Sequence, residues 1–449
     1  MIEGGIMKKC LMTCLLLIML IAIIGCNENT ETSYKYDLFN NDLALVCIKR
    51  SYTADKSQYG YINKKGELVF DKIFETAFPF NNGYAIVQYE ENYYLINTEG
   101  EFVTEGYRYI QYNYENNLYI ATDKTKEKEY LIDSSLSILC EYKLIDFFEE
   151  GLSCVTINEN EKGYINPKGK LVFKCNYKRL ESFSNGFAKC VNENDENVLL
   201  NKEFKVVFNA YSNEIMKAYD NIVYVRDNST YQINVYDYNN NLIREDVSNI
   251  FGSFFSVTKL NIMVNYKPTV AYKAMHLFNG KVIEQFDEYI IGKDSLLVIQ
   301  DSDIIIYDDE FEIIEKINND SGYYTEISSD LFSEKYYIQL IKDGEIINFI
   351  FDLKNNTIER ANYLNEFGLI DEIFNDYIVF ESDYEYCVTT KKGKKVIDFD
   401  VYENYFITIS NDGYFILGNN DWIILDEDKK VILPETDYDY IYVNDNGSW

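Results

Sequence analysis

An eleven-residue stretch that occurs twice constrains the fold of this chain most strongly. GYINKKGELVF at residues 60–70 returns as GYINPKGKLVF at 163–173, with nine of the eleven letters unchanged. In both copies an apolar run ends at an Asn, and a Gly three residues later precedes a second apolar run. The Asn side chain can cap such a turn, Gly accepts the left-handed conformation, and Pro167 suits the second position of a type I turn. The stretch therefore predicts a β-hairpin with a type I turn and a Gly bulge.

The same turn recurs along the chain at a mean spacing of about 36 residues. The turn residues of the clearest copies are Asn63, Gly66, Asn97, Gly100, Asp133, Asn166, Pro167, Gly169 and Asn201, and the looser copies begin at Asp237, Asn279, Asp308, Asp352, Thr390 and Asp426. Apolar runs around the turns are short and show no sustained helical period, so short antiparallel strands are expected. The sequence predicts an all-β array of about eleven units of 33–44 residues, well matched over 42–210 and degenerate over 211–449.

Units of this size need neighbours. One small sheet cannot bury both of its faces, so such units stack in series. Radial stacking gives a β-propeller, and linear stacking gives an open β-solenoid. We expect propeller-like blades, and the open solenoid is the alternative.

A family resemblance follows from these stretches. GYINKKGELVF, FPFNNGYAIV and GYINPKGKLVF resemble the bacterial WG (or KWG) repeat, with good coverage over residues 43–208. The namesake Trp-Gly is absent, because Tyr59-Gly60 and Lys162-Gly163 stand in its place. The resemblance implies a repeat fold and an exported or surface protein. It implies no enzyme activity, since the family has no single catalytic activity to transfer.

The first 25 residues predict a lipoprotein signal peptide. Lys8 and Lys9 precede an apolar run over residues 11–24, which is shorter than the ~20 residues of a spanning helix. The run ends in Ile-Ile-Gly-Cys26, which resembles the bacterial lipobox. The resemblance implies cleavage before Cys26 and acylation of its thiol. Residues 26–41 would then be a polar tether, and the protein extracytoplasmic and lipid-anchored to the cell membrane, with an outer-membrane destination left open. An uncleaved short anchor is the alternative.

The charge of the chain argues against nucleic acid as a partner. The formal net charge is −32 at pH 7, and such a surface repels nucleic-acid phosphates. Acidic loops that keep a Tyr-rich β-protein soluble explain this charge most simply. Attraction of a cation or a cationic ligand is the sharper interpretation.

Residues for catalysis or metal binding form no recognisable pattern. The single histidine, His276, aligns with a variable strand position, and no CxxC motif occurs among the nine cysteines. We expect buried free thiols, with a disulfide among Cys140, Cys154, Cys175 and Cys190 as the alternative. Acidic pairs such as Glu149-Glu150 are abundant by chance, and the loop at 158–163 departs from the calcium-binding pattern. The sequence thus predicts no cofactor and no metal site.

The sequence leaves three functions to consider. The leading prediction is a non-enzymatic cell-envelope lipoprotein whose repeats present a binding or scaffolding surface for a protein or envelope glycan. The first alternative is an extracytoplasmic carbohydrate-active hydrolase that uses a carboxylate pair. The second is a structural spacer subunit with a stable partner and no ligand. Tyrosine is common, at 42 residues, and its ring suits sugar or protein binding wherever it faces outward.

Overall fold

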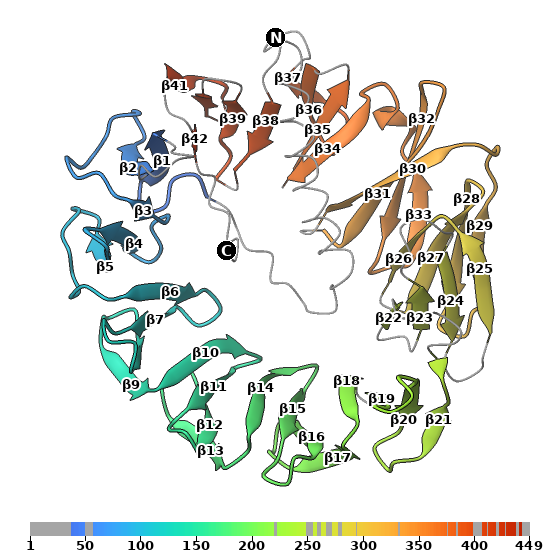
Figure 1. Ribbon diagram of the computed structural model, residues 1–449. Coiled ribbons are helices and arrows are strands. Elements are labelled where there is room, and N and C mark those ends of the chain that lie inside the picture. The colour runs from blue at the N-terminus through green and yellow to red at the C-terminus, as the bar shows by residue number, and fades with distance from the viewer. Residues whose placement is uncertain are drawn as a thin grey trace, which may run out of the picture.

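The protein is a ring of small antiparallel β-sheets. The computed structural model describes residues 37–49, 57–219, 222–247, 255–257, 262–265, 272–276, 281–292, 294–330, 333–374, 376–382, 385–397, 406–410, 412–418, 422–426, 428–436 and 440–441. The strands of these residues form eleven sheets, which follow one another around the ring (Figure 1). We number the sheets as blades 1 to 11 in chain order. The predicted all-β, propeller-like repeat is confirmed.

Blades 3 to 11 each contain four strands that pair antiparallel in chain order. Blades 3 to 6 comprise β6 (Tyr109–Asn113), β7 (Leu118–Thr122), β8 (Glu129–Ile132), β9 (Ile138–Tyr142), β10 (Leu144–Glu149), β11 (Leu152–Thr156), β12 (Lys162–Ile165), β13 (Leu171–Cys175), β14 (Arg179–Ser184), β15 (Phe187–Val191), β16 (Asn197–Asn201), β17 (Val206–Tyr211), β18 (Glu214–Ala218), β19 (Val223–Arg226), β20 (Ile233–Tyr236) and β21 (Leu242–Arg244). Blades 7 to 9 comprise β22 (Phe255–Val257), β23 (Ile262–Asn265), β24 (Tyr272–His276), β25 (Val282–Phe286), β26 (Glu288–Ile291), β27 (Ser295–Gln300), β28 (Asp303–Asp308), β29 (Ile313–Ile317), β30 (Tyr324–Asp330), β31 (Lys335–Lys342), β32 (Glu345–Asp352) and β33 (Thr357–Arg360). Blades 10 and 11 comprise β34 (Leu369–Phe374), β35 (Tyr377–Ser382), β36 (Glu385–Thr390), β37 (Lys395–Ile397), β38 (Phe406–Ile409), β39 (Phe415–Gly418), β40 (Trp422–Leu425) and β41 (Val431–Thr436). A short 3-10 helix, η1 (Asn362–Leu364), precedes β34.

The first two blades are less regular. Blade 2 comprises β3 (Thr76–Ala77), β4 (Tyr84–Tyr89) and β5 (Asn92–Asn97), and blade 1 comprises β1 (Leu43–Lys49), β2 (Gln58–Asn63) and the last strand of the chain, β42 (Tyr440–Ile441). The perimeter strand of each is reduced to isolated bridges, Ile62 with Leu68 in blade 1 and Ile96 with Phe102 in blade 2.

The meander gives the ring two distinct rims. In Figure 1 the first strand of a blade such as β14 lies toward the centre and its later strands lie farther out. Antiparallel strands alternate in direction, so the turns after the first and third strands lie on one side of the ring. We call this side the turn rim. The loops after the second strands and the links between blades lie on the other side, which we call the loop rim.

Alternate residues of the central strands pack against opposite neighbouring blades. On β11, Cys154 joins the core shared with blade 5, whereas Val155 joins the core shared with blade 3. This follows from the two-residue period of a strand, and it explains why strands buried on both faces are continuous apolar runs. The residues Leu296 to Ile299 of β27, all fully buried, are an example.

The ring closes between blades 11 and 1. Leu38 and Phe39 are buried in one core with Ile416, Trp422 and other apolar side chains of blade 11. The carboxylate of Asp412, on the turn rim of blade 11, accepts hydrogen bonds from the backbone N–H of Leu38 at 2.8 Å and of Phe39 at 3.0 Å. The open solenoid, the alternative from the sequence, is therefore wrong.

Both ends of the described chain contribute to the innermost strand of blade 1. Near the loop rim, β42 pairs with β1 through Tyr440 opposite Cys47 and Ile441 opposite Val46. Near the turn rim, Asn40 occupies the innermost-strand position instead and exchanges two backbone hydrogen bonds of 3.0 Å with Leu43. Residues 38–40, inside the predicted tether of residues 26–41, thus belong to the ring.

The same four-strand unit continues on both sides of residue 210, where the sequence similarity between repeats fades. All the predicted turns except that at Asn279 lie in described residues and connect the third strand of a blade to its perimeter strand. Asn279 lies outside the described residues. Within the described part of the chain, no helix is long and apolar enough to cross a membrane.

Candidate functional site

The predicted turn residues build the hairpins of the turn rim. The carbonyl of Asn63 accepts a hydrogen bond from Gly66 N at 2.9 Å, and its Oδ1 accepts bonds from the backbone N–H of Lys65 and Glu67. Gly66 has a φ of 77°, the left-handed conformation that the sequence predicts. The same capping pattern recurs at Asn97 with Gly100, at Asp133, at Asn166 with Pro167 and Gly169, and at Asn201. These residues shape the blades, and their side chains are used within the turns.

Several blades place bulky residues where others have the bulge Gly, blades 3 and 5 among them. Leu136 and Phe204 adopt φ values of 65° and 59°. In blade 2 such a side chain would clash, because a Cβ on Gly100 would lie 2.7 Å from the Phe70 ring. In blade 5 the Phe204 ring stacks on Phe173 of the preceding blade, with ring centroids 4.7 Å apart. Packing between blades therefore compensates for the strained backbone conformation.

The glycine of the repeat has a steric role in the third strand. A Cβ on Gly163 would lie 2.3 Å from the carbonyl oxygen of Phe173 on the adjacent strand, and a Cβ on Gly60 would lie 2.9 Å from Ile48. Real Cβ atoms do not approach backbone so closely. Gly163 is therefore required, whereas at Gly60 the neighbouring atoms are the ends of the Ile48 and Leu68 side chains, which can shift. The residue before the Gly varies between Tyr59 and Lys162.

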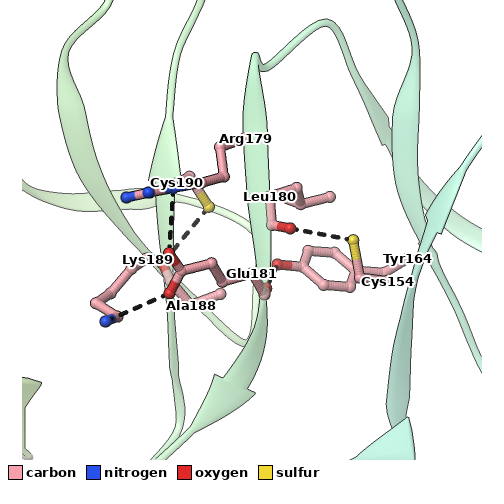
Figure 2. Close-up of polar contacts among 8 residues, drawn as sticks. All are labelled: Cys154, Tyr164, Arg179, Leu180, Glu181, Ala188, Lys189 and Cys190. Atoms are coloured by element: carbon pink, nitrogen blue, oxygen red, sulfur yellow. Dashed lines mark hydrogen bonds and ion pairs between the residues drawn. The ribbon is translucent and has the colours of Figure 1, made fainter. Parts of the chain in front are cut away.

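In blades 1 and 4, where the repeat has its tyrosine, that residue fastens the blade to the next one. The hydroxyl of Tyr61 donates to the Phe78 carbonyl at 2.7 Å, and that of Tyr164 donates to the Glu181 carbonyl at 2.5 Å. Both acceptors belong to the inner part of the following blade, and Figure 2 shows Tyr164 reaching across to Glu181. Burial raises the pKa of both hydroxyls well above the usual value, so they remain donors. We call each such contact a tyrosine staple.

An aromatic pair accompanies each staple. The Tyr61 ring packs edge-on against Phe80, and Tyr164 packs against Phe183, with centroids 4.9 Å apart in both cases. Aromatic pairs of this geometry add about 0.5–1.5 kcal/mol beyond the area they bury. The most faithful part of the repeat is thus a contact between blades.

Two buried thiols lie beside the Tyr164 staple (Figure 2). Cys154 on β11 donates to the Leu180 carbonyl at 3.3 Å, and Cys190 on β15 donates to the Ala188 carbonyl at 3.6 Å. Burial is the main cause that raises the pKa of each thiol to about 12. Both are therefore protonated at neutral pH and are poor nucleophiles.

The other cysteines are consistent with a structural role. Cys140 and Cys175 lie on the perimeter strands β9 and β13 of adjacent blades, but the strand registers place them two residues apart in the repeat, and burial raises the pKa of Cys140 to about 11. The four cysteines of the proposed disulfide alternative, Cys140, Cys154, Cys175 and Cys190, are all free thiols. Cys47 and Cys387 are buried, and Cys26 lies outside the described residues.

Several carboxyl groups on innermost strands have raised pKa values, most strongly Glu288 and Glu372. Glu288 on β26 has a pKa of about 7 because of burial and of the nearby charges of Glu326 and Asp287. Glu372 on β34 also has a pKa of about 7, through burial, although a hydrogen bond with Thr408 of blade 11 lowers it. Burial likewise raises the pKa of Glu326 on β30. The sequence showed the abundance of acids, but not which of them lie on innermost strands.

Glu150, of the acidic pair Glu149-Glu150, connects turns of neighbouring blades. The Glu150 carboxylate accepts a hydrogen bond from Gly186 N of the next blade and forms an ion pair with Lys202 at 2.9 Å. The loop at 158–163 is used internally as well, because Asn158 caps it and Glu161 forms an ion pair with Lys174. His276 ends β24, and its side chain lies outside the described residues. No group of acids, cysteines or histidines that could hold a metal ion occurs among the residues described.

Two tyrosines of the loop rim are the most exposed large hydrophobic side chains among the described residues. Tyr231, in the loop between β19 and β20, is 71% exposed, and Tyr211, at the link between blades 5 and 6, is 62% exposed. Both have left-handed backbone conformations, with φ values of 60° and 55°. Their outward orientation could not be deduced from a sequence in which tyrosines also fill the core.

Comparison with known proteins identifies the repeat. Residues 59–93 and 163–194 match a family model described as the WG containing repeat, so this chain contains WG repeats in these two segments. Both segments begin at or next to the Gly required in the third strand. None of the curated proteins compared with the chain matches it.

Solved structures resemble the chain only loosely. A eukaryotic initiation factor is 12% identical, with 80% of this chain and 96% of that chain covered and a TM-score of 0.32. BamB from Moraxella catarrhalis is 11% identical, with 59% and 92% covered and a TM-score of 0.28. The C-terminal WD40 domain of Sif2 is 12% identical, with 62% and 92% covered and a TM-score of 0.27. At such low TM-scores these likenesses establish neither fold nor function, and the fold rests on the chain's own sheets.

Proposed function

We propose that this protein is a non-enzymatic, lipid-anchored scaffold of the cell envelope whose ring presents a binding surface for a protein or an envelope glycan. The closed ring is the observation that carries the proposal. The repeat residues hold neighbouring blades together through tyrosine staples, shared cores and hydrogen bonds between turns. The rim residues outside these contacts are then available to bind a partner on a rigid support, as in binding proteins whose loops are positioned by a scaffold.

The anchor would hold the ring close to the membrane. The lipid would be attached at Cys26, and the ring begins at Leu38, which is buried. Twelve residues of extended chain span at most about 40 Å. A scaffold tethered in this way would meet ligands that lie within the envelope rather than those free in the medium.

Metabolic labelling with a fatty-acid analogue tests the anchor. The wild-type protein should incorporate the label, and Cys26→Ala should not. Cys10→Ala is the matched control, because it removes a thiol from the same segment but should leave labelling intact. Label that persists in Cys26→Ala would refute the anchor.

The raised pKa of Glu288 supports one alternative, an extracytoplasmic carbohydrate-active hydrolase. A glycosidase needs one carboxyl group that stays protonated near neutral pH and a second carboxylate about 5–10 Å away. The charge of Glu326, on the innermost strand of the next blade, contributes to the raised pKa of Glu288. Hydrolysis of an envelope polysaccharide that disappears in Glu288→Gln would favour the enzyme over the scaffold.

A further inference from the structure

Tyr211 and Tyr231 adopt the left-handed backbone conformation, which does not favour tyrosine. A left-handed conformation is unfavourable for a bulky residue, and Gly or Asn adopts it at lower energy. Each side chain is also largely exposed, so neither residue recovers the loss through core packing. Strained, exposed aromatic residues of this kind point to a role outside the fold itself.

The two tyrosines belong to loops that are fastened together. The side chain of Asn228, three residues before Tyr231, donates to the Ser212 carbonyl at 2.5 Å, and the Ser212 residue follows Tyr211 directly. The backbone N–H of Asn228 also donates to Asn213 Oδ1 at 3.3 Å. The Tyr211 carbonyl is held in turn by Asn197 Nδ2 at 3.3 Å. The rings are therefore carried by one connected patch of the loop rim, formed by residues 211–213 and 227–231, which we call the tyrosine patch.

Asp227 is the charged residue of the tyrosine patch, and the other residues are tyrosines and neutral polar residues. Asp227 Oδ1 is occupied by the backbone N–H of Ser229 and Thr230, each at 2.8 Å. These hydrogen bonds, together with that from the Ser229 hydroxyl, lower the pKa of Asp227 to about 2, so it is ionised at neutral pH. Its carboxylate is exposed on a protein of net charge −32. An anionic ligand would be repelled here, whereas hydroxyl groups could donate to the carboxylate.

We propose that the tyrosine patch is a stacking site for a neutral oligosaccharide. A sugar ring has an apolar C–H face, which can lie on a Tyr ring, and a periphery of hydroxyls, which can bond to the tyrosine hydroxyls and to the carboxylate of Asp227. Tyrosine suits this use because the ring is rigid, apolar on its face and polar at its tip. The inference deepens the proposed scaffold function by naming the glycan class and the surface that binds it.

Titration of the full-length protein in detergent micelles with neutral tetrasaccharides tests the site. The probes are β-1,4-linked glucose and β-1,4-linked N-acetylglucosamine, and the anionic comparison is β-1,4-linked glucuronate of the same length. Saturation-transfer NMR should show contact between at least one neutral probe and the protein. Tyr211→Gly combined with Tyr231→Gly should weaken that binding at least tenfold while the melting temperature stays unchanged or rises, because Gly relieves both left-handed residues.

Two further variants separate stacking from a general effect. Tyr211→Phe with Tyr231→Phe should retain most of the binding, since the rings remain. Tyr324→Ala removes a ring that is 55% exposed on blade 9 and should leave binding unchanged. Unchanged binding in the double Gly variant, binding of the glucuronate probe alone, or no binding of any neutral probe would each overturn the tyrosine patch. In the last case a protein-binding scaffold would still stand, and labelling at Cys26 would test the anchor independently.

Discussion

The tyrosine staple makes a quantitative prediction for the stability of the ring. Tyr164→Phe removes one hydroxyl that donates to the Glu181 carbonyl at 2.5 Å and leaves the ring contacts with Phe183 in place. A hydrogen bond of this kind contributes about 0.5–1.5 kcal/mol net, and a buried carbonyl that loses its donor adds a desolvation term of about 1–3 kcal/mol. Glu181 is only half-buried, which reduces that desolvation term. We therefore expect a loss of about 1–2 kcal/mol in the free energy of unfolding.

Urea unfolding of the full-length protein at pH 7, followed by tyrosine fluorescence, measures this loss. Tyr231→Phe is the matched control, because it deletes the same atom from a side chain that is 71% exposed. Tyr164→Ala should lose considerably more, about 3–5 kcal/mol, since it also empties the space of a buried ring. Tyr61→Phe should repeat the Tyr164→Phe result, given its bond of 2.7 Å to Phe78. The reasoning fails if Tyr164→Phe loses no more stability than Tyr231→Phe.

Three further predictions concern the third strand, the ring closure and pH. Gly163→Ala should destabilise the protein by several kcal/mol in the same urea assay, because its Cβ would lie 2.3 Å from the Phe173 carbonyl oxygen. The control is Gly151→Ala, whose Cβ would meet nothing within 4 Å and which should show only the smaller loss expected at a positive φ. Asp412→Ala removes two hydrogen bonds that close the ring and should speed hydrogen exchange at the amides of Leu38 and Phe39, and protection equal to wild type would contradict this role. The free energy of unfolding should fall as pH rises from about 5 to 8, because the folded state still binds a proton at Glu288 that the unfolded chain releases near the ordinary pKa of about 4.3. Glu288→Gln should reduce this fall by about 1–2 kcal/mol, after allowance for the partial exposure of the group. An unchanged fall would show that the raised pKa of Glu288 does not affect stability.

The hairpins and their number could be predicted because their signal is local. An Asn that caps its own turn and a Gly in the left-handed conformation act within five residues, so the pattern around Asn63 or Asn166 is sufficient. The copies without Gly were found from an Asn or Asp that follows an apolar run, and their spacing supports them. In those, Phe204 adopts the left-handed conformation because it stacks on a ring of the preceding blade, a contact that no local pattern encodes.

The ring closure and the candidate surfaces could not be predicted for the opposite reason. Pairing of Cys47 with Tyr440 joins residues almost 400 positions apart through only two pairs of residues, so it leaves no periodic trace. The raised pKa of Glu372 depends on burial and on Thr408 of the next blade. The exposure of Tyr211 depends on where the chain turns between blades 5 and 6. Each of these properties arises from tertiary structure.

The contrast between staples and later cores explains why the repeat fades in sequence but persists in structure. The family model matches the segments that contain Gly60 with Tyr61 and Gly163 with Tyr164. Blades 8 and 9 instead share a core of aliphatic and phenylalanine side chains, which fill the strands β27, β28, β31 and β32. Branched aliphatic residues pack in many combinations of similar volume, so they conserve the distance between sheets without conserving letters. A staple requires one hydroxyl, one carbonyl and no Cβ beside the backbone, so a model based on letters detects the stapled blades and misses the aliphatic ones.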